Sequence, residues 1–296
     1  MFYFAKKTEE KLLICAVAIA VFAISVFYIL NTQAPDEKAV IATTDDTAGL
    51  PAVPIIMYHS VCENTRVQSD YRIAPSLFEK DLKYLYDKGY TAVFVGDLVG
   101  YVYEGVPLPE KPIIITLDDG YLNNLTEVLP ILEKYDMCAT VSVVGEFIEK
   151  AQKEKDPNPL YAYLSWADIK ALEDSGRIEI GNHTNAMHEI GERRGCMKMS
   201  GESEEHYDKI LSNDLTELQN ALTENAGLTP MVFTYPFGFV SEESLPVIKK
   251  LGFLAALTCY ERINYINGTV EQLYRLGRFN RPPNMTTEEF MKKIGI

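Results

Sequence analysis

The chain has few cysteines and few basic residues, and these two shortages exclude several classes of protein. Its 296 residues include 5 Cys, 4 His and 1 Trp, and no two cysteines form a CxxC pair. The sequence therefore predicts neither a thiolate zinc site nor a disulfide-dense scaffold. Lys and Arg number 28 against 42 Asp and Glu, which gives a net charge of −14. This acidic balance argues against a nucleic-acid partner, because binding to phosphates depends on a basic surface.

Long apolar runs are also scarce, with one exception near the N-terminus. Residues 12–30 read LLICAVAIAVFAISVFYIL, without a charged side chain. A helix of this length spans about 28 Å, close to a bilayer core of about 30 Å. Lys6, Lys7 and Lys11 precede the run, and an excess of Lys on one side marks the cytoplasmic side. We therefore expect a single-pass anchor in the cell membrane, and the alternative is a cleaved signal peptide.

This interpretation divides the chain into four parts. Residues 1–11 are expected in the cytoplasm, and residues 12–30 form the transmembrane anchor. Residues 31–52 are small, polar and acidic, which is typical of an extracytoplasmic linker. Residues 53–296 are long enough for one substantial folded domain outside the membrane.

Within the domain, apolar strand-like segments alternate with amphipathic helix-like segments. The expected strands are 53–58, 91–95, 112–117, 138–144, 178–181, 231–235 and 253–257, and the expected helices are 75–89, 123–135, 166–175, 207–226 and 242–251. This alternation predicts an α/β fold whose parallel sheet is covered on both faces, either a barrel or a doubly wound sheet. Ligands bind beyond the C-terminal ends of the strands in both architectures, so the residues that follow each strand are the candidate site.

Two adjacent carboxylates, Asp118 and Asp119, follow the strand at 112–117. One interpretation is a helix cap and turn, because Asp and Gly suit both. The other is that one carboxylate binds a cation while its neighbour accepts a proton from water.

Three of the four histidines also follow predicted strands. His183 and His188 come after the strand at 178–181. On a helix their side chains would point about 140° apart, so they can share an ion only from a loop. With a carboxylate they would supply a two-His-one-carboxylate metal site. His59 follows the first strand and is either structural or a proton donor, whereas His206 lies in an acidic stretch expected on the surface.

The strand at 231–235 is followed by Pro236, Phe237 and Gly238. This pattern is typical of a turn, and it can also direct a backbone N–H toward a developing oxyanion. Trp166, the only tryptophan, begins a predicted helix and either packs in the core or stacks on a sugar ring.

Taken together, these motifs resemble those of the polysaccharide deacetylase family, the NodB-homology deacetylases of carbohydrate esterase family four. Residues 116–121, TLDDGY, look like the family's TFDDGY motif, and YPFG at 235–238 looks like its third motif. The histidine pair has the longer spacing of the poly-N-acetylglucosamine deacetylase-like branch, which also carries its acidic histidine after the first strand. The resemblance covers about residues 53–296. It departs from the family at the third motif, which lacks its usual Arg, and the usual tethering Asp has no identifiable counterpart. Arg278 is a candidate for the orienting role of the missing Arg.

The resemblance implies a distorted (β/α)7-type barrel and a hydrolase of carbon–nitrogen bonds other than peptide bonds. The implied metal ligands are Asp119, His183 and His188, which would hold a divalent ion, with zinc as the first choice and cobalt, nickel or manganese as alternatives. Asp118 is implied as the base, His59 as the acid and the N–H of Phe237 as the oxyanion donor. The implied substrate contacts are Tyr121, Tyr235, Pro236, Trp166 and Arg278.

The implied reaction removes N-acetyl groups from a cell-surface polysaccharide of the peptidoglycan or poly-N-acetylglucosamine type and releases acetate. Two alternatives stay open at this point. One is an O-acetyl esterase acting on xylan-like glycans, and the other is a surface glycan-binding protein without catalytic activity.

Overall fold

The computed structural model describes residues 47–63, 69–154, 158 and 160–296. The predicted anchor at 12–30, the segment before it and most of the linker at 31–52 lie outside these residues. Across the described part of the chain, no helix combines the length and the apolar character needed to cross a bilayer.

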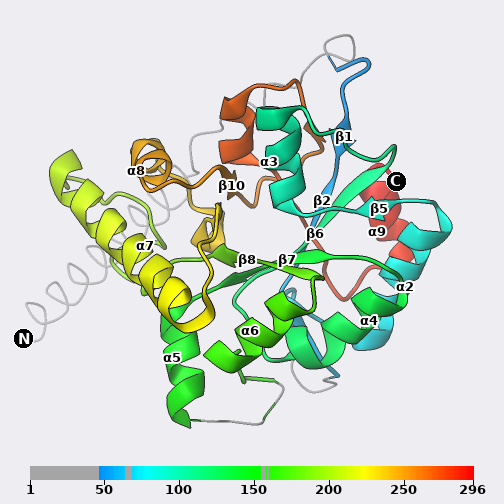
Figure 1. Ribbon diagram of the computed structural model, residues 1–296, viewed down its shortest axis with the longest axis horizontal. Helices are drawn as coiled ribbons and strands as arrows, with labels where there is room; N and C mark the ends of the chain where they lie inside the picture. Colours follow the sequence, from blue (N-terminus) through cyan, green and yellow to red (C-terminus); the bar gives the residue numbers. More distant parts are fainter. Residues whose placement is uncertain (1–46, 64–68, 155–157, 159) are drawn as a thin grey trace, which may run out of the picture. The chain divides into compact units, whose positions relative to one another are not determined.

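The domain is built on a sheet of eight strands (Figure 1). These strands are β2 (Ile55–Tyr58), β5 (Thr91–Ala92), β6 (Pro112–Leu117), β7 (Ala139–Val143), β8 (Ile178–Asn182), β9 (Val232–Thr234), β10 (Ala255–Leu257) and β12 (Phe279–Asn280). Their order is β10-β9-β8-β7-β6-β2-β12, with β5 paired to β6 beside this path. Every pairing in the sheet is parallel. The predicted α/β fold with a parallel sheet is therefore confirmed.

The segment that enters β12 joins the two ends of the sheet. The N–H of Thr258, just after β10, donates to the carbonyl of Leu276 at 2.9 Å, and the N–H of Arg278 donates to the carbonyl of Tyr260 at 3.0 Å. The same segment then continues into β12, which pairs with β2. One short stretch of backbone thus links β10 to β2 by way of β12 and gives the sheet the circular path of a distorted barrel.

Shorter strands lie outside this sheet. β1 (Ala52–Val53) pairs antiparallel with β11 (Asn264–Tyr265), and β3 (Ser60–Val61) pairs parallel with β4 (Arg72–Ile73). The β3–β4 pair directly follows His59 and thereby fixes the chain beyond the end of β2.

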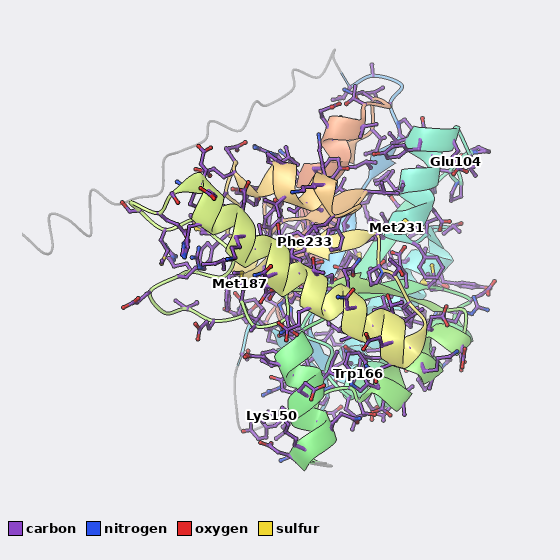
Figure 2. The ribbon with its side chains drawn as sticks, turned by 60° about the vertical axis from the view of Figure 1, so that its left-hand side comes forward. Glu104, Lys150, Trp166, Met187, Met231 and Phe233 are labelled. Carbon is purple, nitrogen blue, oxygen red and sulfur yellow. The ribbon has the colours of Figure 1, made fainter. Side chains whose placement is uncertain are left out.

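The helical segments connect and cover the strands. They are α2 (Pro75–Asp87), α3 (Val95–Glu104), η1 (Asn124–Val128, a π turn), α4 (Leu129–Lys134), α5 (Gly145–Glu154), α6 (Trp166–Asp174), α7 (Glu204–Ala226), η2 (Pro236–Gly238, a 3₁₀ turn), α8 (Ser244–Lys250), η3 (Val270–Arg275, 3₁₀) and α9 (Thr287–Lys293). Figure 2 shows α7 with Met187 and Phe233 beside it, and both residues belong to the apolar cluster that this helix covers.

The strands read as continuous apolar runs because both of their faces are buried. Ile113 and Ile115 of β6 pack with residues of α2, α4, α6 and α9 on the outer face. Ile114, between them, packs with residues of α3 and η3 on the inner face. Side chains alternate between faces along a strand, so Thr116 and Asp118 continue the inner row that begins at Ile114.

Residues 276–281 form the segment that closes the sheet, and we call it the closing segment. A buried ion pair fixes this segment from the outside. Arg281, directly after β12, donates from Nε to Asp81 of α2 at 2.7 Å and from Nη2 at 3.1 Å. The hydroxyls of Tyr58 and Thr287 also donate to Asp81, at 3.2 and 2.6 Å. Because Asp81 and Arg281 are almost completely buried, this network ties β2, α2, α9 and the closing segment together.

The sequence prediction missed some elements and misplaced others. The strand expected at 91–95 ends at Ala92, and Val95 instead begins α3, which was not predicted. The sequence of α3, VGDLVGYVYE, holds two glycines and three valines, which are poor helix formers. This helix forms because Val95, Leu98 and Val99 pack into the inner core. α5 and α9 were missed as well, and α7 begins at Glu204, three residues before the predicted start.

Candidate active site

Asp118 lies directly beyond the end of β6 and is held by a buried arginine. Arg278 donates from Nη1 to Oδ1 at 2.7 Å and from Nη2 to Oδ2 at 2.8 Å. The Nε of the same guanidinium donates to the carbonyl of Thr258 at 2.9 Å, which fixes the plane of the guanidinium. Burial by itself would raise the pKa of Asp118, but the charge and hydrogen bonds of Arg278, together with the nearby His183 and His59, outweigh burial and hold the pKa well below its usual range. Asp118 is therefore ionised and rigidly oriented.

The next residue, Asp119, turns the chain so that both carboxylates face one site. Its φ angle is 73°, in the left-handed region that non-glycine residues rarely adopt. In a continuing strand the two side chains would point to opposite faces. The left-handed turn instead brings Oδ1 of Asp119 to 3.1 Å from Nε2 of His188 and 3.6 Å from Nε2 of His183.

His183 follows β8 and is buried with a defined tautomer. Its Nδ1 lies 2.8 Å from the carbonyl oxygen of Thr234, which can only accept, so Nδ1 carries the proton. Nε2 is then left with a free lone pair on the side of Asp119. Burial lowers the pKa of His183 to about 4, so the ring is neutral near pH 7. A neutral imidazole with its second nitrogen hydrogen-bonded to a carbonyl is the form that binds a metal.

His188, at the other end of the loop, also directs its Nε2 to Oδ1 of Asp119. Its ring lies 4.6 Å from the ring of Phe237 and 5.4 Å from that of Phe147, measured between centroids. Burial lowers the pKa of His188, but the nearby carboxylates, chiefly that of Asp119, together outweigh burial, and the net shift is upward from 6.5. In the absence of a cation, His188 therefore takes up a proton more readily than His183.

These three side chains fit a divalent metal ion. Their ligand atoms all lie within 4.8 Å of one another. Nitrogen and oxygen ligands of tetrahedral zinc, each about 2.0–2.1 Å from the ion, stand about 3.3 Å apart. The 3.1 and 3.6 Å separations agree with this spacing. Oδ1 of Asp119 is also buried without a hydrogen-bond donor in suitable geometry, as expected for an atom that is a metal ligand.

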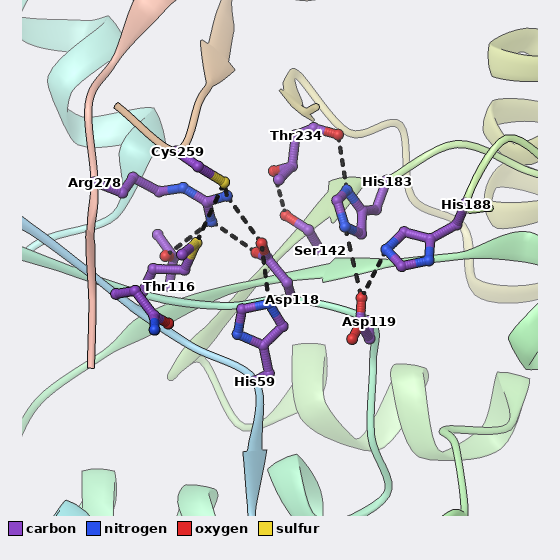
Figure 3. Close-up of polar contacts among 12 residues, drawn as sticks. His59, Thr116, Asp118, Asp119, Ser142, His183, His188, Thr234, Cys259 and Arg278 are labelled. Carbon is purple, nitrogen blue, oxygen red and sulfur yellow. Dashed lines mark hydrogen bonds and ion pairs between the residues drawn. The ribbon is translucent and has the colours of Figure 1, made fainter. Parts of the chain in front are cut away.

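His59 approaches Asp118 from a different direction than Arg278 does (Figure 3). Its Nε2 is 4.0 Å from Oδ2 of Asp118. The ring of Tyr71 packs against the imidazole with centroids 4.7 Å apart. The structure thus brings His59 to the same carboxylate that Arg278 holds, from a different part of the chain.

The turn after β9 brings Phe237 to the site. Phe237 has a φ angle of 57° and is 38% exposed, with its ring against His188. The adjacent Gly238 has no room for a side chain, because a Cβ there would lie 2.5 Å from Cβ of Cys259. The turn is therefore held tightly against the end of β10.

Several predicted substrate contacts are placed differently. Tyr235 is 1% exposed, and its hydroxyl hydrogen-bonds to Ser244 in the core. Trp166 packs in the outer core, which favours the core interpretation over sugar stacking. Arg278 is wholly buried, so its geometry fits the orienting role and not contact with substrate. Pro236 is buried too, whereas Tyr121 is half-buried and stacks on Tyr163 with centroids 5.1 Å apart.

Sequence reasoning missed other residues at the site. Tyr71, Phe147 and Tyr163 line it through ring contacts, and the carbonyl of Thr234 sets the tautomer of His183. Only Thr234 carried a signal, since it lies in the strand predicted at 231–235, just before the turn at 236–238. The three aromatic rings lie in loops or helices whose approach to the site depends on the tertiary fold.

The chain belongs to the polysaccharide deacetylase family, because residues 105–256 match the model of that family. This confirms the predicted family of enzymes. Among relatives, YxkH of Bacillus subtilis is 28% identical over 232 residues, covering 76% of this chain and 73% of YxkH. The poly-beta-1,6-N-acetyl-D-glucosamine N-deacetylase of Escherichia coli K12 is 23% identical over 81% of this chain, which spans only 38% of that protein. The solved structure of Streptococcus pyogenes deacetylase PplD, in complex with acetate, has a TM-score of 0.67 at 19% identity, covering 83% of this chain and 99% of that one. This likeness shows that the NodB-homology fold is shared.

Proposed function

We propose that the protein is a metal-dependent de-N-acetylase that hydrolyses acetamido groups of an N-acetylglucosamine polymer and releases acetate. The observation that carries this proposal is the division of labour between the two adjacent carboxylates. Asp119 faces two imidazoles that can share an ion with it, whereas Asp118 faces an arginine and a histidine. One carboxylate is therefore suited to hold a cation and the other to exchange a proton.

Asp119, His183 and His188 would hold the divalent ion, with zinc as the first choice and cobalt, nickel or manganese as alternatives. When bound, such an ion acts as a Lewis acid on the acetamido carbonyl and lowers the pKa of a water molecule.

Asp118 would accept the proton of the attacking water. Arg278 keeps the carboxylate ionised at neutral pH and occupies one lone pair on each oxygen. Each oxygen retains a second lone pair that can accept a proton. Because the guanidinium fixes both oxygens, the acceptor is already oriented when the substrate arrives.

His59 would donate a proton to the leaving nitrogen. Its Nε2 lies 4.0 Å from Asp118, so the acid and the base approach the same small volume from neighbouring strand ends. Water adds to the carbonyl carbon and the carbon–nitrogen bond breaks, with one proton going to Asp118 and another passing from His59 to the amine. The backbone N–H of Phe237 would donate to the oxyanion that forms in between.

The sequence and the relatives support a particular substrate and location. Relatives in Escherichia coli and Staphylococcus aureus are named poly-beta-1,6-N-acetyl-D-glucosamine N-deacetylases. The apolar run at 12–30 would place the domain outside the cell membrane on a single-pass anchor. A poly-N-acetylglucosamine or peptidoglycan-type polymer at the cell surface would lie within reach of that tether.

The test is acetate release from defined N-acetylglucosamine oligomers by the full chain. We expect activity that a chelator abolishes and zinc restores, with acetylated xylan as the comparison substrate. Greater release from xylan would favour the esterase alternative. Binding of the oligomers without acetate release, in a zinc-loaded sample, would contradict the enzymatic proposal.

A further inference from the structure

The loop between the two histidine ligands is strained at its first residue. Thr184 has a φ angle of 73°, and a β-branched residue is strained in this left-handed region. Its hydroxyl is buried without a partner, so no side-chain hydrogen bond compensates. This turn allows His183 and His188 to face one point although they are five residues apart. Such a conformation persists only where the surroundings hold it.

Two elements hold the backbone around this turn. The side chain of Asn182 accepts the N–H of Thr184 at 2.9 Å. The first residues of α5 donate to the loop carbonyls, Gly145 to Thr184 at 3.1 Å and Glu146 to Asn185 at 2.9 Å. The fit at Gly145 is close, since a Cβ there would lie 1.9 Å from Oδ1 of Asn185.

Two further N–H groups of the loop are taken by a single carboxylate. Asp214, in the middle of α7, accepts the N–H of Asn185 at Oδ1 and the N–H of Ala186 at Oδ2, both at 2.8 Å. Asp214 is 9% exposed. Across the described residues, no Lys, Arg or His forms an ion pair with it. Its charge is therefore directed to two consecutive peptide groups between the metal ligands.

We infer that Asp214 is a positioning residue for the metal centre: it holds the strained loop so that His183 and His188 converge before an ion arrives. This inference rests on the proposed metal site. Outer-shell groups that orient metal ligands typically change metal affinity about 10–100-fold when they are removed. Asp214 touches neither imidazole, so it acts through the backbone.

The experiment measures zinc affinity of the full chain by competition with a chromophoric chelator. Asp214→Asn keeps the size of the side chain but offers one acceptor oxygen in place of two. The matched control is Asp168→Asn, because Asp168 also accepts a backbone N–H, that of Ser165 at 2.9 Å, at the start of α6 in the outer core region. Thermal unfolding of the metal-free proteins shows whether both variants are folded.

We expect Asp214→Asn to raise the Kd for zinc about 10–100-fold, while Asp168→Asn leaves it unchanged. Activity of Asp214→Asn should recover at saturating zinc, because the catalytic groups themselves are intact. If Asp214→Asn does not fold, Asp214→Glu serves in its place, since it keeps the charge but displaces both oxygens, and it should weaken zinc binding in the same direction.

An unchanged Kd in the folded Asp214 variant, or an equal rise in both variants, would overturn the inference. A different result would contradict the proposed function itself, namely that the wild-type chain binds no divalent ion.

Discussion

The closing segment carries two buried arginines, three residues apart, and each forms a bidentate pair with an aspartate on a different side of the sheet. Arg278 reaches inward to Asp118, and Arg281 reaches outward to Asp81. The pairs have similar distances and are both buried. What differs is the surroundings: Asp81 is enclosed by the hydroxyls of Tyr58 and Thr287, whereas Asp118 stands beside His59 and the metal ligands. A buried ion pair therefore does not by itself indicate catalysis; its neighbours decide its role.

The largest effect is expected at the inner pair. Asp118→Asn removes the proton acceptor, and loss of such a group typically lowers kcat about 10²–10⁴-fold. Zinc binding should be retained, because Asp118 is not among the three ligands. Asp119→Asn should lose both activity and zinc. Acetate release and bound zinc, measured on the same samples, check this, and equal loss of zinc in both variants would contradict the division between the two carboxylates.

The outer pair should affect stability instead. Asp81→Asn leaves the buried charge of Arg281 without its counterion, and breaking a buried pair in this way costs about 3–5 kcal/mol. Denaturant unfolding measures the loss, and kcat is then compared per folded molecule. A catalytic loss as large as that of Asp118→Asn would show that the two pairs are not functionally distinct.

The two candidate histidine ligands differ in pKa, which makes zinc binding depend on pH. The pKa of His188 is raised from 6.5 in the metal-free protein, while that of His183 is lowered to about 4. A protonated imidazole cannot bind the ion, so zinc must displace one proton from His188 below the pKa of that residue. Zinc affinity should therefore fall about tenfold per pH unit in this range. Below about pH 4 the dependence should steepen to two protons. Zinc titrations at several pH values test this, and a two-proton dependence already at pH 6 would contradict the assigned order.

The smallest effect is expected at a half-buried carboxylate with which no arginine of the described residues forms an ion pair. Glu179 of β8 accepts the N–H of Gly96 at 3.0 Å and the hydroxyl of Thr140 at 2.7 Å. Burial raises its pKa to about 7 from 4.5. The folded state therefore favours the protonated form, and the stability gained from it is present below pH 4.5 and lost as the pH rises through 7.

Glu179→Gln should accordingly be more stable than the wild type at pH 8, by about 1–2 kcal/mol, and show little difference at pH 4.5. Glutamine can keep both hydrogen bonds, with its oxygen accepting from Gly96 and its amide donating to Thr140. Thermal unfolding at the two pH values checks this. A gain of equal size at both would show that ionisation is not the cause.

The parallel α/β fold and the candidate metal ligands could be predicted from the sequence because both rest on local patterns. The continuous apolar strand at 112–117, the adjacent aspartates and the histidine pair could all be read directly. The pairing of Asp118 with Arg278 joins residues 160 positions apart, and only the closure of the sheet brings them together. The left-handed turns at Asp119 and Thr184 were not readable either, since neither residue type signals such a conformation. α3 forms through packing in spite of the low helix propensity of its residues, so the sequence predicted no helix there.

The closing segment also has a consequence for synthesis. The metal ligands and the base all precede residue 189, but the guanidinium that orients the base belongs to residue 278. The guanidinium that orients the proposed base is therefore made long after the candidate ligands. During synthesis, Asp81 and Asp118 are therefore both made before the arginines that neutralise them, and each carboxylate lacks its counterion until Arg278 and Arg281 follow.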